Sequence, residues 1–226
     1  MIKFVNVTKF YPPDIYALRD INLYVKPSEF VSIVGQSGAG KTTLIKLLMA
    51  EERPSKGKII IGDWDISKIK PSEIPYLRRQ IGIVFQDFKL LKEKTVYENI
   101  AYGLEVIGAR NKFIKEVVPQ VLRVVGLEKK YKRFPDQLSV GEKQRVAIAR
   151  AIVHRPKILA ADEPTGNVDL INTREIIDLF KKINEMGTTV ILVTHNREIV
   201  NYLKTRVIIL EHGQIISDQP EGRYIL

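Results

Sequence analysis

Residues 35–42 have the composition and spacing of a loop that binds phosphate. They read Gly-Gln-Ser-Gly-Ala-Gly-Lys-Thr, which fits the pattern G-x-x-x-x-G-K-[ST]. An apolar run over 30–34 precedes them and an apolar-periodic segment over 43–49 follows, so the loop is predicted to join a strand to a helix. In such a loop, backbone N–H groups and the positive end of the helix dipole surround a phosphate. The chain is therefore predicted to bind a nucleoside triphosphate.

Two side chains of this loop have separate expected tasks. The ammonium group of Lys41 should reach the β- and γ-phosphates, which makes it a candidate catalytic residue. The hydroxyl of Thr42 should bind Mg²⁺. The nucleotide-binding residues predicted here are Gly35, Gln36, Ser37, Gly38, Ala39, Gly40, Lys41, Thr42 and Thr43.

A pair of carboxylates, Asp162 and Glu163, follows the apolar run Ile-Leu-Ala-Ala at 158–161. Strands often end in acidic residues, but after a phosphate-binding loop the pair has a specific interpretation. In enzymes with this loop, an Asp at a strand end holds Mg²⁺. The next carboxylate is placed to orient and deprotonate the attacking water. We therefore expect Asp162 to bind the metal and Glu163 to be the general base.

Residues 138–145, Leu-Ser-Val-Gly-Glu-Lys-Gln-Arg, introduce a helical pattern. Ser139 is a candidate N-cap, and Glu142 stands at the spacing of a capping box. One interpretation is simply a well-capped helix. The other uses the same physics, because a hydroxyl and free N–H groups at a helix N-terminus form an anion site. Two phosphate-contacting surfaces in one chain suggest that two chains meet around nucleotide.

In order and spacing, these segments resemble the ATP-binding cassette (ABC) ATPases over essentially the whole chain, and the segment 138–144 is specific to that family. The resemblance implies that Tyr11 stacks on adenine and that Gln86 contacts Mg²⁺ and links the catalytic core to a helical lobe. It further implies that Asp169 communicates across a dimer and that the catalytic residue His195 contacts the γ-phosphate. Ser139 and Gly141 would contact the nucleotide bound by the second copy.

One position departs from the family pattern, because Val140 stands where the family has glycine. A β-branched residue does not easily adopt positive φ, and its methyl groups would lie near the approaching phosphate. Ser139 and Gly141 remain, so we expect function to persist with altered affinity for the γ-phosphate of the second copy.

The segments 85–91, 95–101 and 164–169 are similar to those of the FtsE family of cell-division ATPases. That resemblance implies an ATP-hydrolysing subunit that forms an ATP-dependent head-to-tail homodimer and acts on an FtsX-like membrane subunit to regulate cell-wall hydrolysis. The ATPase of a lipoprotein-release or macrolide-export transporter shares much of the pattern and is the alternative. A soluble ABC protein of DNA repair or translation is disfavoured, because there is one cassette and no second phosphate-binding loop.

Three apolar residues, Phe88, Leu90 and Leu91, lie among charged residues directly after Gln86. One interpretation is an exposed groove that receives a short cytoplasmic helix of the membrane partner. The other is that all three pack between the core and the helical lobe, since large apolar side chains are usually buried.

The elements that must position these residues alternate between strands and helices. We predict an α/β fold of the ABC ATPase type, with a mixed sheet, antiparallel N-terminal strands and an inserted helical lobe. The whole chain, 1–226, is expected to be one domain with a core at 1–86 and 157–226 and a lobe at 87–156. The predicted strands are 2–7, 21–25, 30–34, 57–62, 81–85, 157–161, 189–193, 207–210 and 214–216, with the first three antiparallel. The predicted helical segments are 43–49, 97–126 and 173–186.

Composition limits the kinds of site, location and partner that the chain can have. The chain has 226 residues, 45% of them apolar, and no cysteine, which excludes disulfides and thiolate metal sites. It shows neither a transmembrane run nor a signal-peptide pattern, so we expect a cytoplasmic protein, peripheral on the inner face of the membrane. The net charge is +10, and residues 110–133 carry eight basic and two acidic side chains. This segment is interpreted as a solvated helical face or as a contact with anionic lipid. Nucleic acid is disfavoured, because interleaved aromatic residues are lacking.

Overall fold

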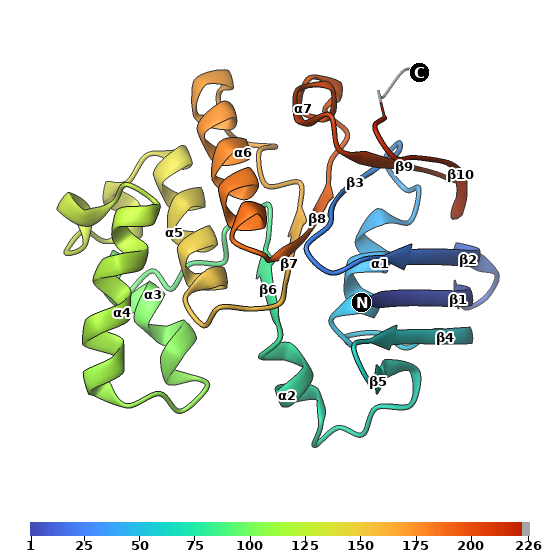
Figure 1. Ribbon diagram of the computed structural model, residues 1–226, viewed down its shortest axis with the longest axis horizontal. Coiled ribbons are helices and arrows are strands. Elements are labelled where there is room, and N and C mark those ends of the chain that lie inside the picture. The colour runs from blue at the N-terminus through green and yellow to red at the C-terminus, as the bar shows by residue number, and fades with distance from the viewer. Residues whose placement is uncertain (223–226) are drawn as a thin grey trace.

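The computed structural model describes residues 1–222, which form two β-sheets and a group of helices (Figure 1). The larger sheet is mixed and has six strands. Their order is β10 (Gln214–Gln219), β9 (Arg206–Glu211), β3 (Phe30–Val34), β8 (Thr189–Val193), β7 (Ile158–Asp162) and β6 (Ile81–Val84). All neighbours are parallel except β10 and β9. The smaller sheet is antiparallel, in the order β2 (Ile15–Val25), β1 (Ile2–Tyr11), β4 (Lys56–Ile61) and β5 (Trp64–Asp65).

The antiparallel N-terminal sheet is confirmed for its first two strands, but the prediction that 30–34 joins it is wrong. That segment is β3, which lies between β9 and β8 and is parallel to both. Each of its five residues is buried. A strand covered on both faces reads as a continuous apolar run, and such a run does not reveal the direction of its neighbours.

The helices divide between the two sides of the larger sheet. Helix α1 (Lys41–Leu48) lies on the side of the smaller sheet, where α2 (Ile74–Arg78) leads into β6. On the other side lie α3 (Val96–Glu105), α4 (Asn111–Val124), α5 (Val140–Ile152) and α6 (Leu170–Glu185). The remaining elements are α7 (Arg197–Leu203) and the 3-10 turns η1 (Ile66–Lys68), η2 (Glu128–Lys130) and η3 (Pro135–Gln137). The predicted helical segment 97–126 is therefore interrupted, and Gly108 adopts a left-handed φ of 78° in the interruption.

The core forms two layers, one on each face of the larger sheet. Along β7, Leu159 and Ala161 face the cluster shared with α3–α6, whereas Ile158 and Ala160 face the cluster shared with α1 and the smaller sheet. This alternation follows from the two-residue period of a strand. Because β9, β3, β8, β7 and β6 are parallel, their carboxyl ends lie at one edge of the sheet. In residues 1–222, no helix has the length and apolarity needed to span a membrane.

Candidate active site

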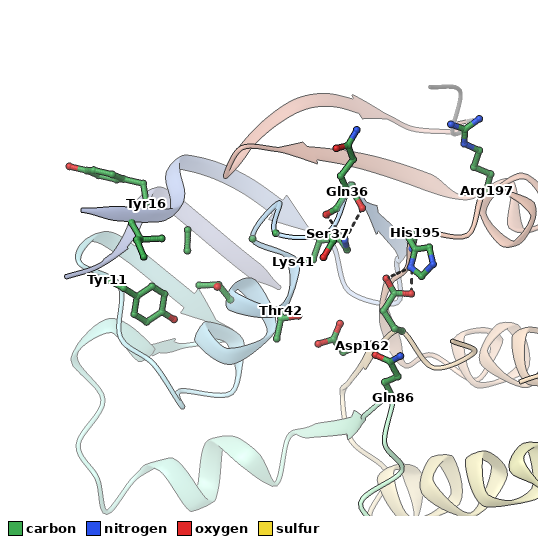
Figure 2. Close-up of a pocket in the computed structure, with 17 residues that line it drawn as sticks. Tyr11, Tyr16, Gln36, Ser37, Lys41, Thr42, Gln86, Asp162, His195 and Arg197 are labelled. Atoms are coloured by element: carbon green, nitrogen blue, oxygen red, sulfur yellow. Dashed lines mark hydrogen bonds and ion pairs between the residues drawn. The ribbon is translucent and has the colours of Figure 1, made fainter. Parts of the chain in front are cut away.

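A cleft of about 810 Å³ opens at the carboxyl ends of β3, β6, β7 and β8 (Figure 2). It brings together most of the residues that the sequence pattern selects, although they are far apart in the chain. The predicted residues that line it are Tyr11, Gly35, Gln36, Ser37, Gly38, Gly40, Lys41, Thr42, Thr43, Gln86, Asp162, Glu163 and His195. Ala39 is buried and does not line the cleft.

The phosphate-binding loop joins β3 to α1 without a side-chain cap. Gly40 stands at the N-cap with φ 103°, and a Cβ there would lie 2.3 Å from the Ala17 carbonyl oxygen. Only glycine fits this close approach. The Lys41 ammonium crosses the loop and donates to the carbonyl oxygens of Gly35, at 2.7 Å, and Gln36, at 2.9 Å. Both acceptors are neutral, and the charge of Lys41 also favours the ionised form of Asp162.

Of the two predicted carboxylates, Asp162 ends β7 and Glu163 follows it directly. Burial raises the pKa of Asp162, a hydrogen bond from Thr42 opposes the rise, and the charge of Glu163 adds to it. A carboxylate in this position gains from a nearby cation. Glu163 has a left-handed φ of 48°, a conformation that costs a non-glycine residue free energy and that concentrates at functional sites.

His195 and Glu163 are hydrogen-bonded to each other. The Nδ1 atom of His195 lies 2.8 Å from Oε1 of Glu163, and the backbone N–H of His195 lies 3.4 Å from Oε2. The backbone N–H of Glu163 also donates to the Val193 carbonyl oxygen, at 3.0 Å, which ties the two strand ends together. The carboxylate therefore has a fixed orientation at the mouth of the cleft.

Gln86 follows β6 and enters the cleft beside Asp162 (Figure 2). The backbone carbonyl oxygen of Gln86 accepts from Nδ2 of Asn167 at 3.4 Å. In the loop after it, Phe88 and Lys89 have left-handed φ angles of 58° and 45°. The guanidinium of Arg150 on α5 donates to both of their carbonyl oxygens, at 2.9 and 2.8 Å. The loop that carries Gln86 is thus attached to the helical layer.

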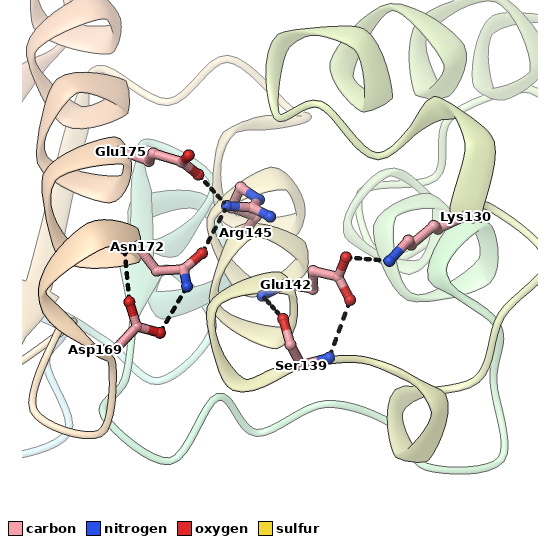
Figure 3. A network of polar contacts seen from close by, with 7 residues as sticks. All are labelled: Lys130, Ser139, Glu142, Arg145, Asp169, Asn172 and Glu175. Carbon is pink, nitrogen blue, oxygen red and sulfur yellow. Dashed lines mark hydrogen bonds and ion pairs between the residues drawn. The ribbon is translucent and has the colours of Figure 1, made fainter.

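Ser139, Gly141 and Asp169 do not line the cleft. Figure 3 shows Ser139 and Asp169 at the N-terminal ends of α5 and α6. Ser139 caps α5 in a complete capping box with Glu142. Asp169 caps α6, accepting from the backbone and side-chain N–H groups of Asn172 at 3.0 and 2.7 Å. A Cβ at Gly141 would lie 2.6 Å from Oδ1 of Asn172. The caps of α5 and α6 are therefore in close contact through Asn172.

Val140 is the first residue of α5 and has a helical backbone. The expectation that it opposes a positive φ is wrong, because the N1 position of a helix needs no such conformation. Its side chain is 41% exposed at this end of the helix. The methyl groups of Val140 would still lie near an approaching phosphate.

Sequence reasoning missed four residues of the cleft, namely Ile15, Tyr16 and Ala17 on β2 and Arg197 on α7. Tyr16 lies close in sequence to Tyr11, and Arg197 is two residues beyond His195. Proximity to a predicted site residue was the available signal for both. Tyr16 stands near Phe10, with ring centroids 5.7 Å apart, and the guanidinium of Arg19 lies 4.7 Å from its ring.

Comparison with known proteins identifies the family. The family described as ABC transporter matches residues 18–166. The cell division ATP-binding protein FtsE of Bacillus subtilis is 51% identical over 224 residues, which cover 99% of this chain and 98% of the relative. The chain is an ABC ATPase of the FtsE family. FtsE of Mycobacterium tuberculosis is 48% identical over 225 residues, covering 99% of this chain and 98% of the relative.

Solved structures agree with this assignment. The ATP-binding cassette MJ0796, in a dimeric post-hydrolysis state bound to ADP and Pi, matches with a TM-score of 0.86 and 34% identity over 99% of this chain and all of that chain. CbiO1 of Clostridium perfringens, part of the transporter complex cbiONQ, matches with a TM-score of 0.90 and 32% identity over 97% of this chain and 88% of that one. The predicted ABC ATPase fold is confirmed, and the chain binds and hydrolyses ATP. Similarity to FtsE favours cell division over lipoprotein release or export.

Proposed function

We propose that two copies of this chain pair around ATP and act on an FtsX-like membrane subunit, which regulates cell-wall hydrolysis during bacterial cell division. The observation that carries the proposal is similarity to FtsE proteins along 99% of the chain, together with a cleft lined by most of the predicted nucleotide-binding residues. The chain would be cytoplasmic and peripheral on the inner face of the membrane.

Within the cleft, the residues have the following proposed roles. Tyr11 stacks on adenine, and the backbone N–H groups of 36–42 with the Lys41 ammonium hold the phosphates. Glu163 takes the proton of the attacking water, and His195, hydrogen-bonded to that carboxylate, contacts the γ-phosphate. The fixed orientation of Glu163 supports its role as the base.

The side-chain oxygen atoms in the cleft also fit Mg²⁺. The Thr42 hydroxyl, the Gln86 amide oxygen and the Asp162 carboxylate line one cleft, and oxygen is the ligand that Mg²⁺ prefers. The raised pKa of Asp162 indicates a carboxylate that a divalent cation would stabilise in its ionised form. Residues 1–222 contain no group of three acidic, His or Cys side chains placed to hold a metal ion, so the triphosphate would supply further ligands. The ion would offset charge on the phosphates.

The second half of the site would come from another copy. Ser139 lies outside the cleft, so the chain cannot bring its helix N-terminus to its own bound nucleotide. In a head-to-tail pair, Ser139 and Gly141 of one copy would meet the γ-phosphate held by the other, and Asp169 would stand between the two sites. Such a pair has two-fold symmetry and an isologous interface, because each copy supplies both halves of the contact.

The membrane partner would dock beside the loop that follows Gln86. Phe88, Leu90 and Leu91 are all half-buried, and Leu90 packs against the core of the helical layer. A groove of about 410 Å³ between α2, α3 and α5 is lined by Arg78, Tyr102, Val106, Arg150 and their neighbours. Since Arg150 also holds the backbone of Phe88 and Lys89, the groove and the loop share one side chain.

Co-purification of the full chain with the FtsX-like subunit encoded in the same genome tests this proposal. The double variant Phe88→Ala/Leu91→Ala should keep ATP hydrolysis by the isolated chain and lose the membrane subunit. Leu90→Ala is the matched control, because loss of a packed side chain should instead lower thermal stability. Joint loss of hydrolysis and stability in the double variant would show that these residues are core. Capture of an export-type membrane protein in place of the FtsX-like subunit would favour the alternative transporter class.

The basic segment 110–133 is proposed either to face anionic headgroups near the membrane or to be a solvated face. Binding of the isolated chain to anionic vesicles, and its loss in salt, separates these two roles.

A further inference from the structure

An acidic side chain stands where the proposed pairing requires an anion-binding helix end. Glu142 lies in the first turn of α5, and its Oε2 atom accepts from the Ser139 backbone N–H at 3.0 Å. Its side chain is only 13% exposed. A carboxylate suits a helix N-terminus in a single chain. It repels a triphosphate that approaches the same end from another copy.

One cation is bound directly to this carboxylate. The Lys130 ammonium, from η2 in the basic segment, forms an ion pair with Oε1 of Glu142 (Figure 3). Arg145 is also near, but its Nη1 atom is bound to Oε2 of Glu175 at 2.7 Å. Lys130 is therefore the side chain that forms the ion pair with Glu142, while Arg145 adds its charge without an ion pair to it.

The hydroxyl of Ser139 is able to donate. Its Oγ atom already accepts from the Glu142 backbone N–H at 3.3 Å, so the oxygen serves the cap while the hydroxyl hydrogen is available to a phosphate. Burial acts to raise the pKa of Glu142, but hydrogen bonds from Lys130 and Ser139 and the charges of Lys130 and Arg145 hold it below the ordinary value. The carboxylate stays ionised, so its compensation depends on a neighbouring cation.

We propose that Lys130 is a positioning residue for the ATPase reaction, which neutralises and holds Glu142 so that Ser139 and the first turn of α5 can meet the triphosphate of a second copy. The inference rests on the proposed pairing of two copies around ATP. It gives one lysine of the basic segment 110–133 a task at the nucleotide rather than at lipid.

The test measures ATP-dependent dimerisation of the full chain by analytical ultracentrifugation, in the Glu163→Gln background that slows hydrolysis. Lys130→Ala should weaken dimerisation by about 5- to 20-fold, a change within the range of coupling between residues in contact. ATP binding to dilute, monomeric protein should be unchanged, because Lys130 does not line the cleft. Lys129→Ala, in the same turn, is the matched control and should dimerise like the parent.

A double-mutant cycle isolates the charge effect. Glu142→Gln keeps an oxygen that can accept from the Ser139 N–H but removes the negative charge. In that background, Lys130→Ala should change dimerisation by less than about twofold. An equal loss with and without Glu142 would overturn the inference, as would dimerisation of Lys130→Ala that matches Lys129→Ala. A change in thermal stability alone would assign the ion pair to folding. If the parent forms no ATP-dependent dimer, the proposed pairing itself is wrong and the inference falls with it.

Discussion

The role of Glu163 leads to the most direct prediction. Replacement by glutamine keeps the length of the side chain and an oxygen that can lie 2.8 Å from Nδ1 of His195, as the carboxylate does. What it removes is the ability to accept a proton from water. Lys41 and the loop 35–42 lie on another element and keep their contacts, so ATP binding should persist.

The expected loss is large. General-base catalysis contributes about 10²- to 10⁴-fold, so Glu163→Gln should lower turnover by at least about 10²-fold. That corresponds to about 2.7 kcal/mol in activation free energy. A longer-lived ATP state should also accumulate as the paired form. Because the left-handed backbone at 163 is unchanged by the substitution, the unfolding temperature should stay close to that of the wild type.

Steady-state phosphate release, with ATP binding measured separately on dilute protein, checks both halves of this expectation. Glu198→Gln, on the first turn of α7 and outside the cleft, is the control and should hydrolyse ATP within about twofold of the wild type. Turnover by Glu163→Gln within about threefold of wild type would refute the assignment and require another base.

Three further changes test other parts of the site. Tyr11→Ala should weaken ATP binding by about 1–3 kcal/mol, the scale of base stacking, with a similar loss for GTP; equal affinity in a titration of wild type and variant would exclude stacking. Asp162→Asn should raise the unfolding temperature of the nucleotide-free protein at pH 7 and abolish hydrolysis. The folded pKa of Asp162 is raised, so its contribution to stability is present below the unfolded pKa and lost as pH rises through the folded pKa. The gain in unfolding temperature should therefore shrink near pH 4. A gain that does not depend on pH in thermal melts would show that the raised pKa of Asp162 is not its cause. Val140→Gly should tighten ATP-dependent dimerisation. It should also lower the free energy of unfolding by up to about 1 kcal/mol, since glycine disfavours a helix. Weaker dimerisation of the variant in light scattering would show that valine favours the pairing rather than impairing it.

Those parts of the cleft that depend on local spacing could be predicted from the sequence. The loop 35–42 needs only its own residues and the elements beside it, and Asp162 and Glu163 follow directly from the end of an apolar strand. Parallel strands place their carboxyl ends at one edge, so these segments meet once the strand directions are known, and the apolar run at 30–34 did not reveal its direction. Arg197 and Tyr16 enter the cleft only because α7 and β2 are packed where they are, and no residue pattern marks them.

Gly141 shows why residue type alone gives an incomplete explanation. The family resemblance implies phosphate contact for this glycine, and a small residue suits that task. The structure adds a second constraint, because Asn172 occupies the space that a Cβ at 141 would fill. Asn172 in turn holds both carboxylate oxygens of Asp169. A side chain at 141 would therefore push apart the caps of α5 and α6 even in a single chain. Because both caps belong to the half-site proposed to meet the second copy, their contact makes Ser139 and Asp169 approach that nucleotide as one unit.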